Sequence, residues 1–368
     1  MKPVPAALLF LTLTLAAARS QSPAPASPPA GPSTNTAKPD DDFDDLHYLD
    51  VQVIRRDNGE PVTRISPRDF RVLENGFTHP VRRVTVDRWP LSVVLLVNTG
   101  KDFQPALAPI AKDIDLALQK LRPKDEVSVI AFNETSELLQ EFTTDRKAVA
   151  AKFFQLTDPL WQKKLGKKTD ADQALRHAGE LMNGAKANHR RVVIVFSQET
   201  LFSWWPQFKA DKAAYARDVL RSGSAICGVM LSKEMSGFSR LLTLGAPVWH
   251  ETISPTPVNT QPLVRVWAER TGGEVFGGDR LGLAPALARL FERLHQRVLV
   301  GFIPIRPERD VSFRSLDLEV SSELEDREGP VEVRVREGYF APAAPRPTPT
   351  PTPNPMAPSG PMQVDGRR

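Results

Sequence analysis

The sequence predicts an α/β fold, a doubly wound and mostly parallel sheet, accompanied by a smaller antiparallel β module. Two observations predict this fold. Between residues 89 and 297, short apolar runs alternate with amphipathic segments, which is typical of buried parallel strands joined by helices. Before and after this region, strand-like segments follow one another without helices between them. We expect these outer segments to pair with each other, because so few strands are hardly stable alone.

The parallel sheet is expected to begin at the apolar run 93–97, which ends at the polar loop 98–102 and precedes an amphipathic helix at 105–121. Further strands are expected at 127–132, 192–196, 225–231 and 274–276, and further helices at 144–156, 169–184, 209–220, 261–270 and 283–296. Gly272 and Gly273 suit the C-terminal cap of one of these helices. In open sheets of this kind, ligands bind beyond the carboxyl ends of the strands. The loop 98–102 is therefore the first place to look for function.

The outer segments are interpreted as antiparallel strands. At 47–54 apolar and polar residues alternate, and Asp57-Asn58-Gly59 follows as a turn signal. The other expected strands are 71–73, 81–86, 299–304, 313–320 and 331–339. We expect residues 46–88 and 298–341 to form one small sandwich, with the α/β part, 89–297, between them in the chain.

The two ends of the chain differ from its middle. Residues 1–20 predict a signal peptide, with Lys2, an apolar stretch at 6–17 and expected cleavage before Gln21. The apolar stretch is shorter than the ~20 residues of a spanning helix, so no stable membrane span is expected, and an uncleaved anchor is the alternative. Residues 21–45 predict a disordered linker and 342–368 a disordered Pro-rich tail. The chain is therefore expected to be secreted or periplasmic.

The composition argues against several kinds of protein. The 48 Lys+Arg and 44 Asp+Glu leave a net charge of only +4, and no Arg-rich stripe predicts nucleic-acid binding. The single cysteine, Cys227, lies in an apolar strand, so an inert buried thiol is expected rather than a nucleophile. The six histidines show no paired spacing on one helix face, so zinc is not predicted, and His177 and His189 are expected on the surface. A hydrolase is the least favoured alternative, because no nucleophile motif is visible.

Six segments of the chain resemble a von Willebrand factor A domain and the secreted bacterial proteins, known mainly from acidobacteria, that carry a related domain. The resemblance covers residues 47–341, and the segments are ISPRDFRVLENG (65–76), WPLSVVLLVNTG (89–100), KDEVSVIAFN (124–133), RRVVIVFSQE (190–199), WAERTGGEVF (267–276) and VREGYF (335–340). It implies a metal-ion-dependent adhesion site at the carboxyl edge of the sheet. In the family, an Asp-x-Ser-x-Ser loop, a Thr and a later Asp hold a divalent cation, usually Mg²⁺.

This sequence departs from that pattern at most positions, and the residues at the five usual ligand positions are Asn98, Gly100, Asp102, Thr169 and Gln198. Both usual Asp carboxylates have become amides, which bring no negative charge. Three nearby lysines, 101, 167 and 168, oppose a cation further. We therefore expect a degenerate site with no cofactor and no ordered Mg²⁺; the candidate ligands, should an ion bind, are Asp102, Thr169 and Gln198. Without metal, Asn98 and Thr99 are expected to cap the following helix, with Gly100 shaping the turn.

We interpret the chain as a non-catalytic, adhesion-like protein-interaction module with a protein partner at the cell envelope or outside the cell. The expected contact loops are 98–102, 165–170 and 198–206, and the candidate contact residues are Asn98, Thr99, Lys101, Asp102, Thr169, Gln198, Trp204 and Trp205. The Trp pair is either packing at a helix start or an exposed partner contact. The alternative is a structural envelope protein, in which the Pro-rich tails matter more than the loops.

Overall fold

The computed structural model describes residues 46–86, 89–186, 188–198, 217–231, 263–278, 282–304 and 312–341. Contacts divide the chain into two units, Met1–Asp44 and Asp45–Arg368, and every described residue belongs to the second. The expected signal peptide, linker and Pro-rich tail lie outside the described residues, as do Trp204 and Trp205.

A six-stranded sheet forms the α/β part, in the order β6-β5-β4-β7-β8-β9. Its strands are β4 (Leu91–Asn98), β5 (Glu126–Phe132), β6 (Ser136–Thr143), β7 (Arg190–Gln198), β8 (Ala225–Leu231) and β9 (Val275–Gly278). All neighbouring pairs are parallel except β5 and β6. Every residue of β4, β5 and β8 is buried, because helices cover both faces of the sheet. The expected α/β fold is confirmed, and the antiparallel edge strand β6 is an addition that was not predicted from the sequence.

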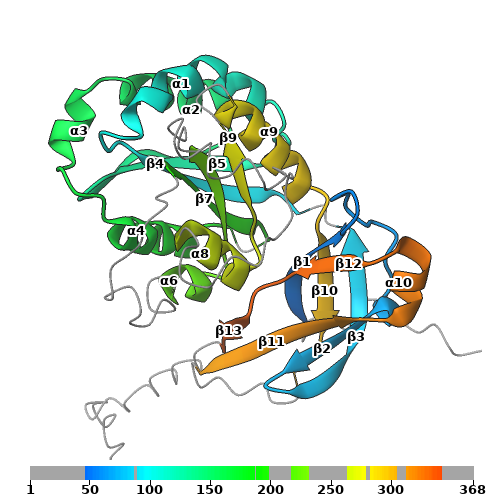
Figure 1. The fold of residues 1–368 in the computed structure, drawn as a ribbon. Helices are drawn as coiled ribbons and strands as arrows, with labels where there is room; N and C mark the ends of the chain where they lie inside the picture. Colours follow the sequence, from blue (N-terminus) through cyan, green and yellow to red (C-terminus); the bar gives the residue numbers. More distant parts are fainter. Residues whose placement is uncertain are drawn as a thin grey trace, which may run out of the picture. The chain divides into compact units, whose positions relative to one another are not determined.

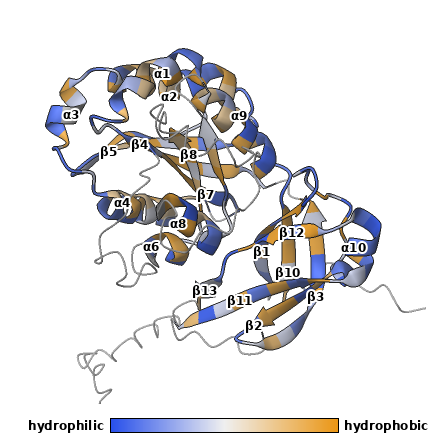
Figure 2. Cartoon of the chain, viewed as in Figure 1, coloured by the Kyte–Doolittle hydropathy of each residue, from blue (hydrophilic) through white to orange (hydrophobic). Residues whose placement is uncertain are grey.

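Helices cover the two faces of this sheet, as Figure 1 shows. One face packs against α1 (Gln104–Leu118), α2 (Arg146–Leu156) and α9 (Leu283–Leu294), and the other against α4 (Ala171–Asn183), α6 (Arg217–Arg221) and α8 (Leu263–Thr271). The short α3 (Leu160–Lys164) lies between α2 and α4 in the chain. The side chains of Asp145 and Asp170 accept backbone N–H groups at the starts of α2 and α4, so local sequence defines both helix starts. Figure 2 shows the apolar strands between helices of mixed polarity.

A seven-stranded antiparallel sheet forms the β module, in the order β12-β1-β10-β3-β2-β11-β13. Its strands are β1 (His47–Arg55), β2 (Phe70–Glu74), β3 (Phe77–Val86), β10 (Val298–Phe302), β11 (Phe313–Val320), β12 (Val331–Arg334) and β13 (Gly338–Phe340). Segments from both ends of the described chain therefore pair in one sheet, as expected. The β module was expected to be the smaller part, but its sheet has seven strands and the sheet of the α/β part has six.

The antiparallel sheet curls instead of forming a two-sheet sandwich. Its end strands, β12 and β13, are separated in sequence only by residues 335–337. That connection spans at most ~14 Å, so the two ends of the strand order must approach each other. The single strand expected at 331–339 is thus wrong, because this segment supplies both end strands. The curl encloses a core that includes Leu49, Val72, Val300 and Phe302.

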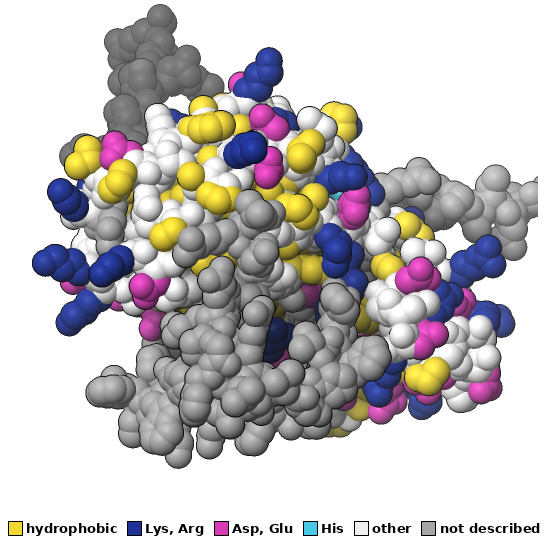
Figure 3. All heavy atoms as spheres, turned by 45° about the horizontal axis from the view of Figure 1, so that its top comes forward, with side chains coloured by type: hydrophobic (Ala, Val, Ile, Leu, Met, Phe, Trp, Pro, Cys, Tyr) yellow, Lys and Arg dark blue, Asp and Glu magenta, His cyan; other side chains and the backbone are white. Residues whose placement is uncertain are grey.

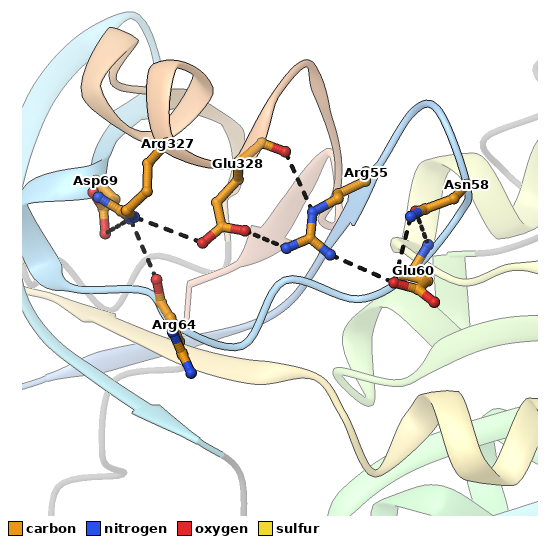
Figure 4. A network of polar contacts seen from close by, with 7 residues as sticks. All are labelled: Arg55, Asn58, Glu60, Arg64, Asp69, Arg327 and Glu328. Atoms are coloured by element: carbon orange, nitrogen blue, oxygen red, sulfur yellow. Dashed lines mark hydrogen bonds and ion pairs between the residues drawn. The ribbon is translucent and has the colours of Figure 1, made fainter. Parts of the chain in front are cut away.

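Arginine contacts fasten the short helix α10 (Ser322–Glu328) to the N-terminal part of the β module (Figure 4). Arg327 Nη2 lies 3.2 Å from Asp69 Oδ2, at the end of the 3₁₀ turn η1 (Pro67–Asp69). Arg55, the last residue of β1, forms an ion pair with Glu328. These contacts connect residues more than 250 positions apart in the chain. They explain how the first and last segments form one module.

Buried ion pairs connect the β module to the amino edge of the six-stranded sheet. Arg297, directly before β10, is 1% exposed, and its Nε lies 2.9 Å from Asp50 Oδ1 on β1. Glu274, directly before β9, accepts Gln52 Nε2 of β1 at 3.2 Å. The same carboxylate lies 3.0 Å from Arg334 Nη1 of β12. This junction lies at the opposite end of the parallel strands from the edge where the site is expected.

Candidate functional site

The candidate site is the carboxyl edge of the six-stranded sheet. We call its described part the edge loops, defined as residues 98–103, 133–135, 165–170 and 197–198. Asn98 ends β4 and is 3% exposed. Its Nδ2 donates to Ser197 Oγ at 3.1 Å, and its Oδ1 accepts the Gly100 backbone N–H at 2.7 Å. Asn98 therefore connects β4 to β7 and shapes the turn that follows.

Asn98 and Thr99 do not cap α1, and that expectation is wrong. The helix starts at Gln104, and its N-cap residue is Phe103, without a side-chain cap hydrogen bond. An N-cap side chain reaches only the first few backbone N–H groups, and residues 100–103 separate Thr99 from the helix. Thr99 instead turns toward β5, where its Oγ1 donates to Phe132 O at 3.2 Å.

Asn133 connects two of the edge loops, a role that was not predicted from the sequence. It follows β5, is 1% exposed, and its Nδ2 donates to Gly166 O at 2.6 Å. Its Oδ1 accepts Thr169 Oγ1 at 2.9 Å, and its backbone carbonyl accepts Asp170 N at 2.6 Å. A signal for it exists in the sequence: like Asn98, it directly follows a buried apolar strand.

Gly100 lies where three side-chain oxygens converge. A Cβ atom at this position would lie 2.9 Å from Asn98 Oδ1, 3.1 Å from Asn133 Oδ1 and 3.2 Å from Thr169 Oγ1. The missing side chain therefore allows three loops to approach one another closely. Two of these oxygens already accept internal hydrogen bonds, and the third donates one.

Asp102 and Gln198 meet at the outer part of the edge. Gln198 Nε2 donates to Asp102 Oδ2 at 3.1 Å, which connects the loop after β4 to the end of β7. The structure thus places Asn98, Gly100, Asp102, Thr169 and Gln198 at one edge of the sheet. Lys101, Asp102, Lys167, Lys168 and Thr169 are exposed.

The donor set does not fit a hard divalent cation. Asp102 is the only carboxylate among the five usual positions, and its Oδ2 is already bound by the Gln198 amide. The oxygens around Gly100 are neutral and bonded to one another. Mg²⁺ exchanges its tightly held water only for several strong oxygen donors in near-octahedral geometry. Across the described part of the chain, no three His, Cys, Asp or Glu side chains gather as a metal-binding group.

Two carboxylates at the start of α4 add to the electrostatics of the edge. Asp170 Oδ1 accepts the backbone N–H groups of Asp172 and Gln173 at 3.1 and 3.0 Å. Burial, together with the nearby Asp170 charge, raises the pKa of Asp172 to about 6, although Arg176 acts in the opposite direction. Asp170 is therefore held as a helix cap, while Asp172 begins to protonate in mildly acidic solution.

One serine–histidine–glutamate contact bears on the hydrolase alternative. Ser92 Oγ donates to Glu126 Oε1 at 2.7 Å and lies 3.1 Å from His189 Nδ1. The hydroxyl has a single proton, so His189 is not placed to remove it. Ser92 is 0% exposed, which keeps a substrate away from Oγ. His189 was expected on the surface and is instead largely buried, because it packs against these two side chains at the amino edge.

Comparison with known proteins agrees with this architecture. Residues 97–199 match the family model of the von Willebrand factor type A domain. The match begins at the end of β4, ends beside β7, and contains Asn98, Asn133, Thr169 and Gln198. All the edge loops therefore lie within the matched segment. No curated protein matches the chain.

Several solved structures are similar to this chain at low sequence identity. One is an aerotolerance-related membrane protein from Bacteroides fragilis, with 12% identity over 55% of this chain and 99% of that chain, and a TM-score of 0.37. A von Willebrand factor type A protein from Catenulispora acidiphila shows 10% identity over 82% and 74% of the two chains, with a TM-score of 0.41. BatB from Bacteroides thetaiotaomicron shows 16% identity over 55% and 98%, with a TM-score of 0.36.

No helix among the described residues is both long enough and apolar enough to cross a bilayer.

Proposed function

We propose that this protein is an exported, non-catalytic module that binds another protein through its edge loops without a metal ion. Von Willebrand factor type A domains are generally interaction modules, and the matched segment contains all the edge loops. We place the partner at the cell envelope or outside the cell, because residues 1–20 have the features of a secretion signal. Secretion or a periplasmic location is part of the proposal.

The hydrogen-bond frame around Asn133 supports this proposal most directly. Asn133 holds the loop before α4 through Gly166, Thr169 and Asp170, and Thr99 and Asn98 hold the loop after β4. Loops that are fixed before binding lose less conformational entropy when a partner arrives. The frame uses neutral amides and hydroxyls, so it keeps its shape without a cation.

A structural envelope protein is the second candidate. It rests on the Pro-Thr repeat at 346–355, which favours an extended semi-rigid segment. In that case the partner would contact the tail, and changes in the edge loops would leave binding unchanged. The hydrolase alternative is not proposed, because Ser92 is buried and its proton is directed at Glu126.

Site-specific photo-cross-linking tests the proposed function. A cross-linking residue at Thr135, exposed in the edge loops, should capture a protein from the envelope fraction of the source cells. The same residue at Lys147, exposed on α2, is the matched control and should not capture it. Asn133→Ala should reduce capture from Thr135, because it releases two loops. Equal capture from both positions, or capture that survives Asn133→Ala in the folded protein, would contradict the proposal.

A further inference from the structure

Two arginines at the junction between the β module and the six-stranded sheet lack a carboxylate partner among the described residues. Arg191 is the second residue of β7, and Arg336 lies in the connection 335–337 between β12 and β13. Both residues are partly buried. Two guanidinium charges are therefore left without a counter-ion at this junction.

The turn after α6 brings the two guanidinium groups close together. Arg191 Nη1 donates to Ser222 O at 2.7 Å. Arg336 Nη2 donates to the next carbonyl along the chain, Gly223 O, at 3.0 Å. The backbone beside Arg336 is itself fixed, because the N–H of the following residue donates to Arg270 O at 2.8 Å. Both positive charges are thus held against one turn of the chain.

The electrostatics of the junction agree with an accumulation of positive charge. Burial holds the pKa of Arg336 below its usual range, and the charges of Arg297 and Arg191 act in the same direction. Asp50 acts in the opposite direction, but from beyond ion-pair distance. Burial also lowers the pKa of Arg191. An arginine remains charged in neutral solution, so the two like charges stay side by side.

The acidic side chains around these two arginines already have basic partners. These carboxylates, each with a basic partner and the N···O distance, are Asp50 with Arg297 at 2.9 Å, Glu126 with Lys186 at 2.6 Å, Asp218 with Arg221 at 3.6 Å and Glu337 with Arg270 at 3.7 Å. The charges of Arg191 and Arg336 therefore remain in excess. Over the face that Figure 3 shows, basic and acidic side chains are interspersed, so this excess is a local feature of the junction.

Capping of α6 explains only part of this arrangement. Arginine side chains often donate to the last carbonyls of a helix, and Ser222 and Gly223 directly follow α6. A guanidinium group has five N–H donors, however, and Arg336 uses Nη2 alone for this contact. Its Nε and Nη1 have no partner among the described residues, and neither is a buried atom. These donors remain available to a ligand that approaches from solvent.

We propose that Arg336 and Arg191 bind a small tetrahedral oxyanion, inorganic phosphate or sulfate, at this junction. The planar fork of Arg336 matches two oxygens of such an anion, and Arg191 supplies the second positive charge. A bound anion connects β7 and the turn after α6 to the connection between β12 and β13, so it stabilises the junction of the two sheets. This site lies at the opposite end of the parallel strands from the edge loops, and it does not depend on the proposed partner.

Equilibrium dialysis of the full chain against radiolabelled inorganic phosphate, at constant ionic strength, tests this site. The native protein should bind phosphate at one saturable site. Arg336→Gln removes the charge and the fork, and should weaken binding about tenfold. Arg71→Gln is the matched control, because it removes the same charge from an exposed position on β2, and it should change binding less than twofold. Unlabelled sulfate should displace the phosphate, and the displacement curve shows which of the two anions the site prefers.

Thermal unfolding supplies a second readout. A ligand raises the melting temperature only if it binds the native state, whereas the general stabilising effect of phosphate and sulfate acts on every variant alike. Phosphate should therefore raise the melting temperature of the native protein and of Arg71→Gln more than that of Arg336→Gln. Arg336→Lys keeps the charge without the planar fork, so its shift should lie between those of the native protein and Arg336→Gln.

Three results would overturn the inference. The first is no saturable binding of phosphate by the native protein, and the second is binding by Arg336→Gln within twofold of the native value. The third is equal weakening by Arg71→Gln and Arg336→Gln, which would indicate a general attraction of anions. If circular dichroism shows that Arg336→Gln does not fold, Arg191→Gln takes its place with the same expected loss. Each of these failures leaves the proposed function standing, because capture at Thr135 reports on the edge loops alone.

Discussion

Replacing Asp50 by Asn should strongly destabilise the protein, because Asp50 neutralises a buried guanidinium. The Arg297 side chain is 0% exposed and its Nε lies 2.9 Å from Asp50 Oδ1; Arg190 Nη1 lies 3.4 Å from the same oxygen. Burial alone would raise the pKa of Asp50, but Arg190 and Arg297 together hold it below its usual range. Asp50→Asn keeps the shape and removes the charge, so the buried guanidinium of Arg297 loses the carboxylate to which its Nε donates.

The expected loss is about 3 kcal/mol in the free energy of unfolding. Removing one partner of a buried ion pair typically costs 3–5 kcal/mol. We expect the lower end, because Arg297 Nη2 still donates to Asp50 O at 3.2 Å and to Gly272 O at 2.7 Å. That loss is a large part of the ~5–15 kcal/mol by which native proteins are stable.

Guanidinium unfolding followed by circular dichroism measures this loss. Asp57→Asn is the matched control: Asp57 is exposed just after β1, and its replacement should change stability by less than ~0.5 kcal/mol. The double variant Asp50→Asn with Arg297→Met should lose less than the sum of the single variants, because the Arg297 guanidinium is removed together with its carboxylate partner. A loss below ~1 kcal/mol for Asp50→Asn would refute the reasoning.

The stability that Asp50 contributes to the native protein should decrease when the solution is made acidic. The folded pKa of Asp50 lies below its unfolded value of 3.8, so the stabilisation is complete above that pH. It is lost as the pH falls through the folded pKa. The difference in unfolding free energy between native protein and Asp50→Asn should therefore be constant near neutrality and should narrow only in strong acid.

Four further predictions concern other parts of the chain. Mg²⁺, Mn²⁺ or chelator should not shift the melting temperature of the native protein, since a ligand stabilises only if it binds. Metal-dependent stabilisation should appear when the usual ligands are restored together, although the side-chain oxygen of residue 98 must move to make room for the new Cβ at residue 100. A clear metal-dependent shift in the native protein would contradict the proposed metal-free site. The restoring changes are Asn98→Asp, Gly100→Ser, Asp102→Ser and Gln198→Asp. Burial, with smaller contributions from the charges of Arg336 and Arg314, lowers the pKa of His47 from 6.5 to about 3. The unfolded chain therefore takes up the proton first, and stability should fall as the pH drops through that range. His47→Phe should remove this fall in melting temperature, and an unchanged pH profile would exclude His47 as its cause. Deleting residues 313–339 removes β11, β12 and most of β13 and should make β1 to β3 sensitive to limited proteolysis. Protection equal to that of the full chain would contradict the shared sheet. N-terminal sequencing of the mature protein should begin at Gln21 or within a few residues of it, and an intact Met1 would rule out cleavage.

Sequence patterns predicted the parts of the fold that depend on near neighbours. The apolar run at the centre of β4 and the apolar strand β8 identify buried strands, because a strand covered on both faces can carry few polar residues. Asp145 and Asp170 mark the starts of α2 and α4 through hydrogen bonds that cross only two or three residues. At Gly272, a positive φ of 73° ends α8, as the Gly-Gly pair indicated.

Elements with ambiguous patterns were missed. In β6 no residue is fully buried, so neither strand alternation nor an apolar run is clear. Residues 331–339 were predicted as one strand. The sequence does not reveal that the first part of this segment, β12, pairs with β1, whereas the last part, β13, pairs with β11. The family resemblance implied which residues to expect at the carboxyl edge of the sheet. The role of Asn133 was not predicted, because it depends on contacts with Gly166 and Thr169, 33 and 36 residues away.

The sequence by itself therefore determined the class of fold, the positions of most parallel strands along the chain, and the residue types at the carboxyl edge of the sheet. These properties depend on the residue types and on their nearest neighbours in the chain. Only the tertiary structure decided which distant groups meet. Arg297 finds its counter-ion 247 residues earlier in the chain, at Asp50, and Thr169 finds the amide of Asn133. Such pairs leave no local pattern in the sequence, because each of these polar side chains could equally lie on the surface. Only when folding buries the side chain does it need a hydrogen-bond or ion-pair partner.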